Sequence, residues 1–277
     1  MTGDFGATPA VDFPTPLKTE TSQLAEIIPG TGQPVVKGQK VKVDLSVYNG
    51  TTGETLQESA YDGSTQSGIV ISDQTIAGLS NALECAQVGS RLAVVVSPDD
   101  AFGPQGGSAD LGIAATDTIV FVIDVVKSYL TRANGAAQPA ENGLPAVVLA
   151  EDGTPGITVP SATPPTELQV GVLKKGTGAT VKEGEPVTVA YSGVVWGEKT
   201  AFDSTWTTGV PAEFLAADGS KTQGGVIPGF AEALIGQTVG SQIVAVIPPD
   251  QAYGDQVSGP IPANSTLVFV VDILGVN

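Results

Sequence analysis

An internal duplication constrains this sequence more than any other feature. The stretch GTGQPVVKGQKVKV from Gly30 matches GTGATVKEGEPVTV from Gly176, and TIVFVIDVV from Thr118 matches TLVFVVDIL from Thr266. Self-similarity at this range indicates two copies of one fold. The 277 residues are long enough to bury two compact cores. Two further matching pairs support the duplication: TPAVDFP with TPGITVP, and SPDDAFG with PPDQAYG.

The stretch between the copies is rich in Ala, Gly and Pro and lacks sustained periodicity, which is typical of a linker. We therefore predict a first domain over residues 1–127, a linker over 128–157 with one short extended segment, and a second domain over 158–277.

Within each copy, apolar residues alternate with small polar ones. Val187, Val189 and Tyr191 point one way in this pattern, which predicts half-buried antiparallel strands. One helix is predicted in VIPGFAEALIGQ, where Pro228 suits the first turn and Gly236 the C-terminal cap. TIAGLSNALECAQVG is its counterpart. Each domain is therefore predicted to be α+β, with a bent antiparallel sheet wrapped around one short helix.

Charge and composition exclude several classes of function. The chain has 29 acidic and 12 basic residues, a net charge of -17, so it lacks the basic face on which nucleic acids or anionic membranes bind. It contains no histidine, which rules out Ser-His-Asp and Cys-His catalysis and His-based metal sites. Apolar runs are interrupted by Asp124 and Asp272, so no membrane insertion is expected. The single cysteine, Cys85, lies in an apolar pattern and is interpreted as a buried structural thiol.

Three sequence features that could suggest a nucleotide, calcium or sugar site are interpreted as having no such function. GTG at residues 176–178 precedes a strand and opens no helix, so it is a turn and no dinucleotide fingerprint. The acids of SPDDAFGPQGGSADLG lack the ligand spacing of an EF-hand. Carboxylate pairs for glycoside hydrolysis have no obvious sugar-binding aromatic platform beside them.

Five aromatic residues of the second copy come from separate elements, and their phases allow all of them to face the concavity between sheet and helix. They are Tyr191, Phe202, Phe230, Tyr253 and Phe269. Aromatic residues in a small sheet domain are usually core. Two details favour a pocket instead. Asp203 directly follows Phe202, and Tyr253 lies in a Pro/Gly-bounded turn, where its hydroxyl can bind a ligand.

The succession GTGATVKEGEPVTVAYSGVVW, TAFDST, VIPGFAEALIGQTVGSQIVAVIPPDQAYGD and IPANSTLVFVVDIL resembles the FKBP family of peptidyl-prolyl cis-trans isomerases over about the last hundred residues. The resemblance implies two tandem FKBP-like domains, each a half-barrel sheet curled around one helix. It implies a catalytic pocket made of Tyr191, Phe202, Asp203, Val226, Ile227, Phe230, Tyr253 and Phe269. It also implies substrate contacts from Ile261, Trp206 and Phe214.

The second copy departs from the family pattern at a few places. Phe230 replaces the Trp commonest at the pocket floor, an insertion precedes Val226, and Ala212 stands where an aromatic is frequent. The flap VSGPIPANS, which carries Ile261, is one residue shorter.

Isomerisation of an Xaa-Pro bond is compatible with the absence of histidine. It requires no nucleophile and no proton removal, only rotation of the amide out of resonance against a barrier of about 18–20 kcal/mol. An apolar pocket favours the twisted amide, which has lost its charge-separated form. The resemblance implies that the Ile227 N–H and the Tyr253 hydroxyl hold the substrate, and that Asp203 interacts with the distorted carbonyl region and with Tyr191.

The first copy departs from the pocket at nearly every aligned position, so we predict little or no isomerase activity for it. It would serve as a spacer, a partner surface or a weak chaperone-like binding face. Only Ile76 and Phe121 persist. The replacements are Leu45 for Tyr191, Leu56 for Phe202, Gln57 for Asp203, Thr75 for Val226, Leu79 for Phe230 and Phe102 for Tyr253.

The expected partners are proline-containing polypeptide clients and macrolide inhibitors, with no nucleic acid, no cofactor and no metal, in a monomeric protein. The opening MTGDFGATPAVDFPTPL resembles the mature region of secreted or lipid-anchored bacterial FKBP proteins, which predicts an extracytoplasmic location. The alternative is a non-catalytic protein that binds clients or an assembly partner on an FKBP scaffold. A hydrolase has no recognisable nucleophile and base.

Overall fold

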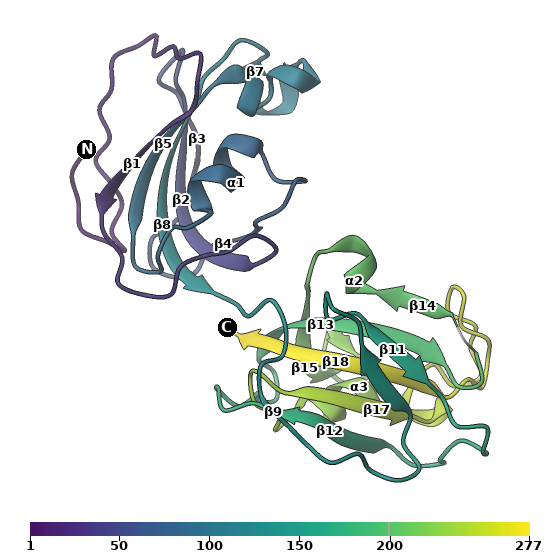
Figure 1. The fold of residues 1–277 in the computed structure, drawn as a ribbon. Coiled ribbons are helices and arrows are strands. Elements are labelled where there is room, and N and C mark those ends of the chain that lie inside the picture. The colour runs from purple at the N-terminus through teal and green to yellow at the C-terminus, as the bar shows by residue number, and fades with distance from the viewer. Residues whose placement is uncertain (199) are drawn as a thin grey trace. The chain divides into compact units, whose positions relative to one another are not determined.

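The structure, a computed structural model, describes residues 1–198 and 200–277 and divides into two compact units, Met1–Tyr129 and Leu130–Asn277 (Figure 1). Each unit has a bent, almost wholly antiparallel sheet with one principal helix on its inner face. This confirms the predicted α+β arrangement, in which each of two tandem domains has a bent antiparallel sheet wrapped around one short helix. Within the described ranges, no helix is long and apolar enough to cross a membrane.

The sheet of the first unit has the strand order β1-β5-β8-β2-β3, with β4 also paired to β2. Helix α1 (Ala77–Leu83) packs on β5. Short strands β6 (Gly107–Ser108) and β7 (Ile113–Ala114) form a separate pair in the loop after β5. The main strands are β1 (Gln23–Ile28), β2 (Lys40–Asn49), β3 (Thr55–Glu58), β4 (Ser67–Val70), β5 (Arg91–Val96) and β8 (Ile119–Ser128).

The second unit repeats this arrangement with the order β16-β15-β13-β18-β17-β12-β9, and β14 also pairs with β13. Its helices are the short α2 (Thr205–Thr208) and the principal α3 (Pro228–Leu234). The strands are β9 (Ala136–Ala137), β10 (Ala146–Leu149), β11 (Pro155–Thr158), β12 (Gln169–Lys175), β13 (Pro186–Val195), β14 (Ala201–Ser204), β15 (Ala212–Asp218), β16 (Gly225–Val226), β17 (Gln242–Ile247) and β18 (Leu267–Val276).

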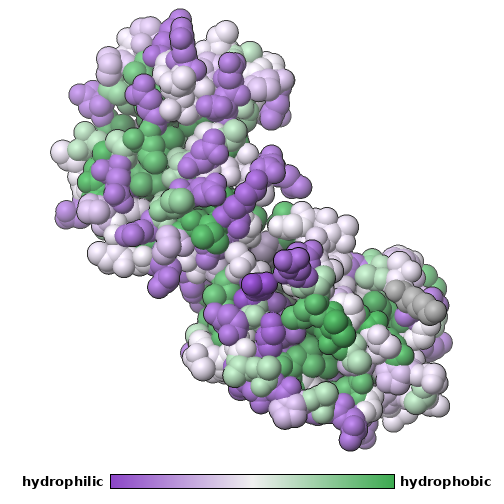
Figure 2. All heavy atoms as spheres, in the orientation of Figure 1, coloured by the Kyte–Doolittle hydropathy of each residue, from purple (hydrophilic) through white to green (hydrophobic). Residues whose placement is uncertain are grey.

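The core of each unit lies between sheet and helix, because alternate residues of the central strands face the helix. In β17, Ile243, Ala245 and Ile247 join the inner core with Leu234 of α3, while Val244 and Val246 face the opposite side of the sheet. Figure 2 shows that apolar residues also reach the surface of both units, among polar ones.

The segment between the copies differs from the expected linker. Residues 130–157 belong to the second unit, where β10 and β11 form a hairpin. Val147 and Ile157 of this hairpin pack against Val244 and Val246, on the outer face of the sheet. The stretch was predicted as a linker because its two strands are only four residues long and are surrounded by Gly and Pro.

Cys85 also differs from its prediction as a buried thiol. Helix α1 ends at Leu83, and Cys85 is exposed with φ of 70°. The equivalent residue after α3 is Gly236, with φ of 83°. Cys85 therefore occupies the left-handed position that ends a helix, where a glycine is usual.

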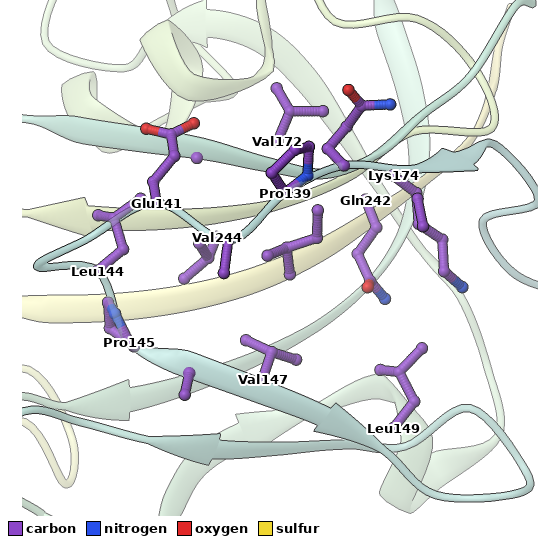
Figure 3. Close-up of a pocket in the computed structure, with 16 residues that line it drawn as sticks. Pro139, Glu141, Leu144, Pro145, Val147, Leu149, Val172, Lys174, Gln242 and Val244 are labelled. Atoms are coloured by element: carbon purple, nitrogen blue, oxygen red, sulfur yellow. The ribbon is translucent and has the colours of Figure 1, made fainter.

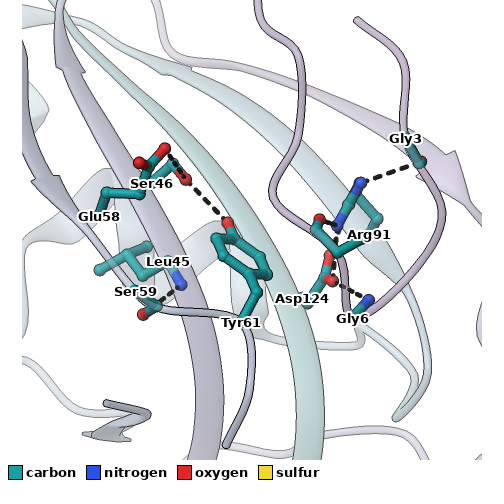
Figure 4. Close-up of polar contacts among 10 residues, drawn as sticks. Gly3, Gly6, Leu45, Ser46, Glu58, Ser59, Tyr61, Arg91 and Asp124 are labelled. Carbon is teal, nitrogen blue, oxygen red and sulfur yellow. Dashed lines mark hydrogen bonds and ion pairs between the residues drawn. The ribbon is translucent and has the colours of Figure 1, made fainter. Parts of the chain in front are cut away.

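A buried ion pair lies on the outer face of the first sheet (Figure 4). Arg91 Nε donates to Asp124 Oδ1 at 2.6 Å and Arg91 Nη2 donates to Asp124 Oδ2 at 2.8 Å, and neither side chain is exposed. The N-terminal segment completes the site: Gly3 O and Ala7 O accept from the guanidinium, and the Gly6 N–H donates to Asp124. The residues that open the chain are thus part of the folded unit.

Candidate functional site

The inner face of the second sheet holds a pocket of about 330 Å³, at the small end of the range for small-molecule sites. Strands β13, β14, β15, β16 and β18 supply its walls, and α3 supplies its floor. The lining residues are Tyr191, Phe202, Asp203, Phe214, Gly225, Val226, Ile227, Phe230, Tyr253 and Phe269.

Aromatic rings make up the pocket's apolar interior. Phe230 from α3 lies 4.9 Å from Phe269 and 5.5 Å from Phe214, measured between ring centroids, with edge-to-face geometry at both contacts. Tyr191 contacts the same three rings at 5.5 to 6.2 Å. Edge-to-face and tilted contacts of this kind stabilise ring packing, so these four rings together form a continuous apolar wall of the cavity.

Gly193 makes this packing possible. It lies opposite Phe269 on β18 and opposite Asp203 on β14. A Cβ atom at this position would lie 2.5 Å from the Phe202 ring and 2.8 Å from the Phe269 ring. The two rings therefore occupy the space that any other side chain would need.

Tyr191 and Asp203 form the polar side of the pocket. The Tyr191 hydroxyl donates a hydrogen bond to Asp203 Oδ2. Burial raises the pKa of Tyr191 well above its usual value, and the neighbouring Asp203 carboxylate raises it further, so the phenol is neutral at physiological pH. The Tyr191 backbone is fixed by Thr205 at the start of α2, whose Oγ1 accepts from the Tyr191 N–H at 2.9 Å.

The rim contributes groups that can contact a chain in solvent. Tyr253 is 38% exposed and follows the short helical turn η4 (Pro249–Gln251). Ile227 is the N-cap residue of α3. Because the first amides of a helix lack partners within the helix, a peptide carbonyl has a donor available at this end.

The structure brings together nine of the eleven residues predicted for the site: the eight predicted as catalytic, and Phe214. It does not place the other two in the pocket. Ile261 is only 4% exposed and belongs to the hydrophobic core, and Trp206 lies on α2 outside the lining. The sequence analysis missed the lining residue Gly225 and the role of Gly193. The available signal for Gly193 was that a glycine lies within a strand at a position where the first copy has Val47. Glycine within a strand often marks a place where another group approaches the backbone closely.

The first unit carries the same backbone frame with different side chains. Leu45 N–H donates to Ser59 Oγ at 3.0 Å, as Tyr191 N–H does to Thr205. Val47 lies opposite Phe121 and Gln57, in the place of Gly193. Leu56, Ile76 and Phe102 pack against a core that contains Leu45, Leu79 and Phe121. Leucine thus replaces an aromatic residue at three of the equivalent positions, 45, 56 and 79, while Phe102 and Phe121 remain aromatic.

No group of three or more His, Cys, Asp or Glu side chains in the described part of the chain lies close enough to hold a metal ion. The arrangement in the second unit offers apolar enclosure, a tyrosine–carboxylate pair and hydroxyl and amide donors at the rim. This chemistry suits binding and distorting a peptide and provides no nucleophile with a base.

Comparisons with known proteins agree with this arrangement. The sequence model of the family described as "FKBP-type peptidyl-prolyl cis-trans isomerase" matches residues 32–126 and 178–274. The "FK506-binding protein" of Streptomyces anulatus is 32% identical over 124 residues, 44% of this chain and 96% of that protein.

Two further relatives are longer than the matched region. The "Outer membrane protein MIP" of Legionella longbeachae is 38% identical over 132 residues, 47% of this chain and 52% of that protein. The "FKBP-type peptidyl-prolyl cis-trans isomerase FkpA" of Escherichia coli strain K12 is 40% identical over 114 residues, 41% of this chain and 39% of that protein. The chain thus covers about half or less of each of these two relatives.

Proposed function

Because the chain belongs to the FKBP-type peptidyl-prolyl cis-trans isomerase family, with two tandem domains of this type, we propose that isomerisation of Xaa-Pro bonds takes place in the aromatic pocket of the second unit. The observation that carries this proposal is the convergence of four phenylalanine rings, Tyr253 and the Tyr191–Asp203 pair on one pocket of about 330 Å³.

The rings favour the twisted amide over the planar one. A planar amide has a charge-separated resonance form that water stabilises, and rotation about the C–N bond removes it. Transfer into an apolar cavity therefore costs the planar ground state more than the twisted state, which lowers the barrier to rotation. Phe202, Phe230 and Phe269 supply this cavity.

The polar groups hold the substrate in position. The Ile227 N–H and the Tyr253 hydroxyl donate to carbonyl groups of the substrate chain, so that binding energy outside the proline fixes the bond that rotates. Asp203, already bonded to Tyr191, presents its negative charge to the carbon side of the distorted carbonyl.

The test is the cis-to-trans relaxation of a short Xaa-Pro-Phe peptide with the full chain and matched variants in the two units. We expect Asp203→Ala and Phe269→Ala to lower the catalysed rate by roughly tenfold or more, a loss of about 1.4 kcal/mol. The equivalent substitutions in the first unit, Gln57→Ala and Phe121→Ala, leave the rate unchanged. A rate that falls with the first-unit variants instead assigns the activity to that unit.

The first unit is proposed to contribute little isomerisation, because leucine replaces an aromatic residue at three of the equivalent positions. In addition, no counterpart of the Tyr191–Asp203 bond can form between Leu45 and Gln57. The Asp203→Ala, Phe269→Ala double variant then shows only the uncatalysed relaxation rate. Substantial remaining catalysis contradicts this assignment.

The proposed partners are proline-containing polypeptides, and macrolides of the FK506 type are proposed inhibitors because a similar protein is named for binding FK506. We propose an extracytoplasmic location, since another relative is named an outer membrane protein. The chain is proposed to act as a monomer, which its elution volume in gel filtration tests.

A further inference from the structure

A second hollow lies on the outer face of the second sheet, on the side away from the aromatic pocket. Its volume is about 390 Å³, within the range of small-molecule sites. One wall is the sheet, at β12 and β17, and the other is the segment 137–149 that includes β10 (Figure 3). Val147 and Leu149 point from β10 toward the sheet, and Val244 faces them (Figure 3).

Most of this hollow is apolar. It is lined by Leu144, Val147, Leu149 and Val244. Val244 belongs to a small cluster of buried valines on the outer face of the sheet, and Leu144 and Val147 pack against that cluster. Leu144 closes tightly over the strand beneath it, since a Cβ atom on Gly171 would lie 2.3 Å from Leu144 Cδ1. The segment that carries Leu144 therefore packs closely on β12 at Gly171, and the hollow lies beside this contact.

One end of the hollow is cationic. Lys174 is half-buried, and its Nζ donates to Ala133 O at 3.2 Å, which leaves further N–H donors. An adjoining hollow of about 480 Å³ shares Leu149 and Lys174 and adds Arg132. A ligand atom near Lys174 is therefore within a region that two positive side chains line.

The acid at this end is already satisfied. Asp272 Oδ1 accepts from Gln242 Nε2 at 2.6 Å, and Oδ2 accepts from the Ala133 N–H at 2.7 Å. Burial raises the pKa of Asp272, and the positive charges of Lys174 and Arg132 oppose this shift, so both cations lie near this carboxylate. The other acid of the lining, Glu141, is exposed and lies toward the opposite end from Lys174 (Figure 3). One carboxylate thus faces two positive side chains, Lys174 and Arg132, which leaves one positive charge in excess at this end.

We propose that this hollow binds a single anionic amphiphile, an unbranched alkyl chain placed against Val147 and Val244 with its acidic head at Lys174 and Arg132. Charge complementarity argues for an anion. A chain with 29 acidic and 12 basic residues repels anions in general, so Lys174 at the end of this apolar hollow and Arg132 in the adjoining one are a local exception. The proposal is independent of the isomerase function.

Isothermal titration of the full chain with decanoate and with decyltrimethylammonium tests the site, because the two probes share an alkyl chain and differ in charge. We expect decanoate to bind at one site per chain and the cationic probe to bind at least tenfold more weakly, against the net charge of -17. Lys174→Met keeps the side-chain stem and is expected to weaken decanoate binding by roughly tenfold, as a lost charge-assisted contact does. Lys175→Met is the matched control, because Lys175 is exposed and does not line the hollow.

Two further variants separate this site from the aromatic pocket. Val147→Trp fills the hollow and is expected to abolish binding, whereas Phe202→Ala, in the isomerase pocket, leaves the affinity unchanged. The proposal is overturned if decanoate does not bind, if the cationic probe binds as tightly, if Lys174→Met and Lys175→Met are equivalent, or if Phe202→Ala alone removes binding. A further outcome is that the chain binds phosphatidylglycerol vesicles but not decanoate, and that Lys174→Met abolishes the vesicle binding. This result assigns the basic end to a lipid surface and also overturns the proposal.

Discussion

The rings of Phe202 and Phe269 meet edge to face, with 5.6 Å between their centroids, beside the backbone of Gly193. In the first unit, the residue equivalent to Gly193 is Val47, between Gln57 and Phe121. The two units therefore differ at this position: Gly193 leaves room for the Phe202 ring beside Phe269, whereas the Val47 side chain takes up this space beside Phe121.

Gly193→Ala is expected to damage the pocket without removing any of its functional groups. The added methyl group needs space that both rings now fill, and such overpacking typically costs about 1–3 kcal/mol of stability. We expect the isomerase rate to fall by roughly tenfold, since displaced rings no longer enclose the amide. Peptide relaxation kinetics and urea unfolding of the full chain measure the two effects. An unchanged rate would show that the Phe202–Phe269 contact does not matter for catalysis.

The buried ion pair of the first unit is expected to be costly to break. Arg91→Met leaves Asp124 buried without its counterion, a change that typically costs about 3–5 kcal/mol. Replacing both residues, as Arg91→Met with Asp124→Leu, is expected to cost much less. Hydrogen exchange in peptides from β5 and β8 measures the local stability.

The second unit supplies a control for this prediction, because Gln242 takes the place of Arg91 there and donates to Asp272. Gln242→Met removes a neutral donor and is expected to cost about 1–3 kcal/mol. Equal losses for the two single variants would mean that the charge of Arg91 adds nothing.

Cys85→Gly is expected to stabilise the first unit. Cys85 holds a left-handed backbone conformation, which costs a residue other than glycine roughly 1–2 kcal/mol, partly offset by the greater freedom of glycine in the unfolded chain. We expect a gain of about 1 kcal/mol in thermal or urea unfolding of this unit. Cys85→Ala, which keeps the strain, should give no comparable gain. A gain of the same size for alanine would attribute the effect to the thiol.

Stability is expected to fall at alkaline pH through the buried tyrosines. Burial raises the pKa of Tyr61 to about 12, and the hydrogen bond with Ser46 opposes this only in part. An unfolded tyrosine ionises near pH 10, so above that pH the unfolded chain has lost a proton that the folded chain keeps. The contribution of Tyr61 is therefore complete below about pH 10 and is lost as the pH rises through about 12.

Absorbance at about 295 nm during alkaline titration follows tyrosine ionisation. Tyr61→Phe should remove one of the late-titrating groups and make stability less dependent on pH between about 10 and 12. If the titration of the variant overlaid that of the unaltered chain, Tyr61 would not be the buried group assigned here.

The fold was predictable because each sequence signal for its strands and helix occurs twice in the chain. Two copies of the same alternation and two helices with the same boundaries point to one architecture, and α3 begins at Pro228, the residue predicted for its first turn. The aromatic lining was predictable for the same reason, since strand phase determines which residues face the helix. Nine of the eleven predicted site residues line one pocket in the structure.

The remaining features depend on contacts that no local pattern contains. The hairpin of β10 and β11 forms because Val147 and Ile157 find the outer face of β17, more than eighty residues later in the sequence. Cys85 was assigned to the core because it follows an apolar helix, but the helix ends two residues earlier. Ile261 lies on the predicted flap, yet its side chain packs into the core.

Each unit holds its own opening segment against its last strand, and this has a consequence for how the protein is made. Gly6 bonds to Asp124 across 118 residues, and Ala133 bonds to Asp272 across 139 residues. On the ribosome, both opening segments therefore emerge long before their partners exist. The first unit can close once β8 has emerged, while the second is still being translated and waits for β18. Until then, the β10–β11 hairpin has only its own internal pairing, because the outer face on which it packs includes strands β17 and β18.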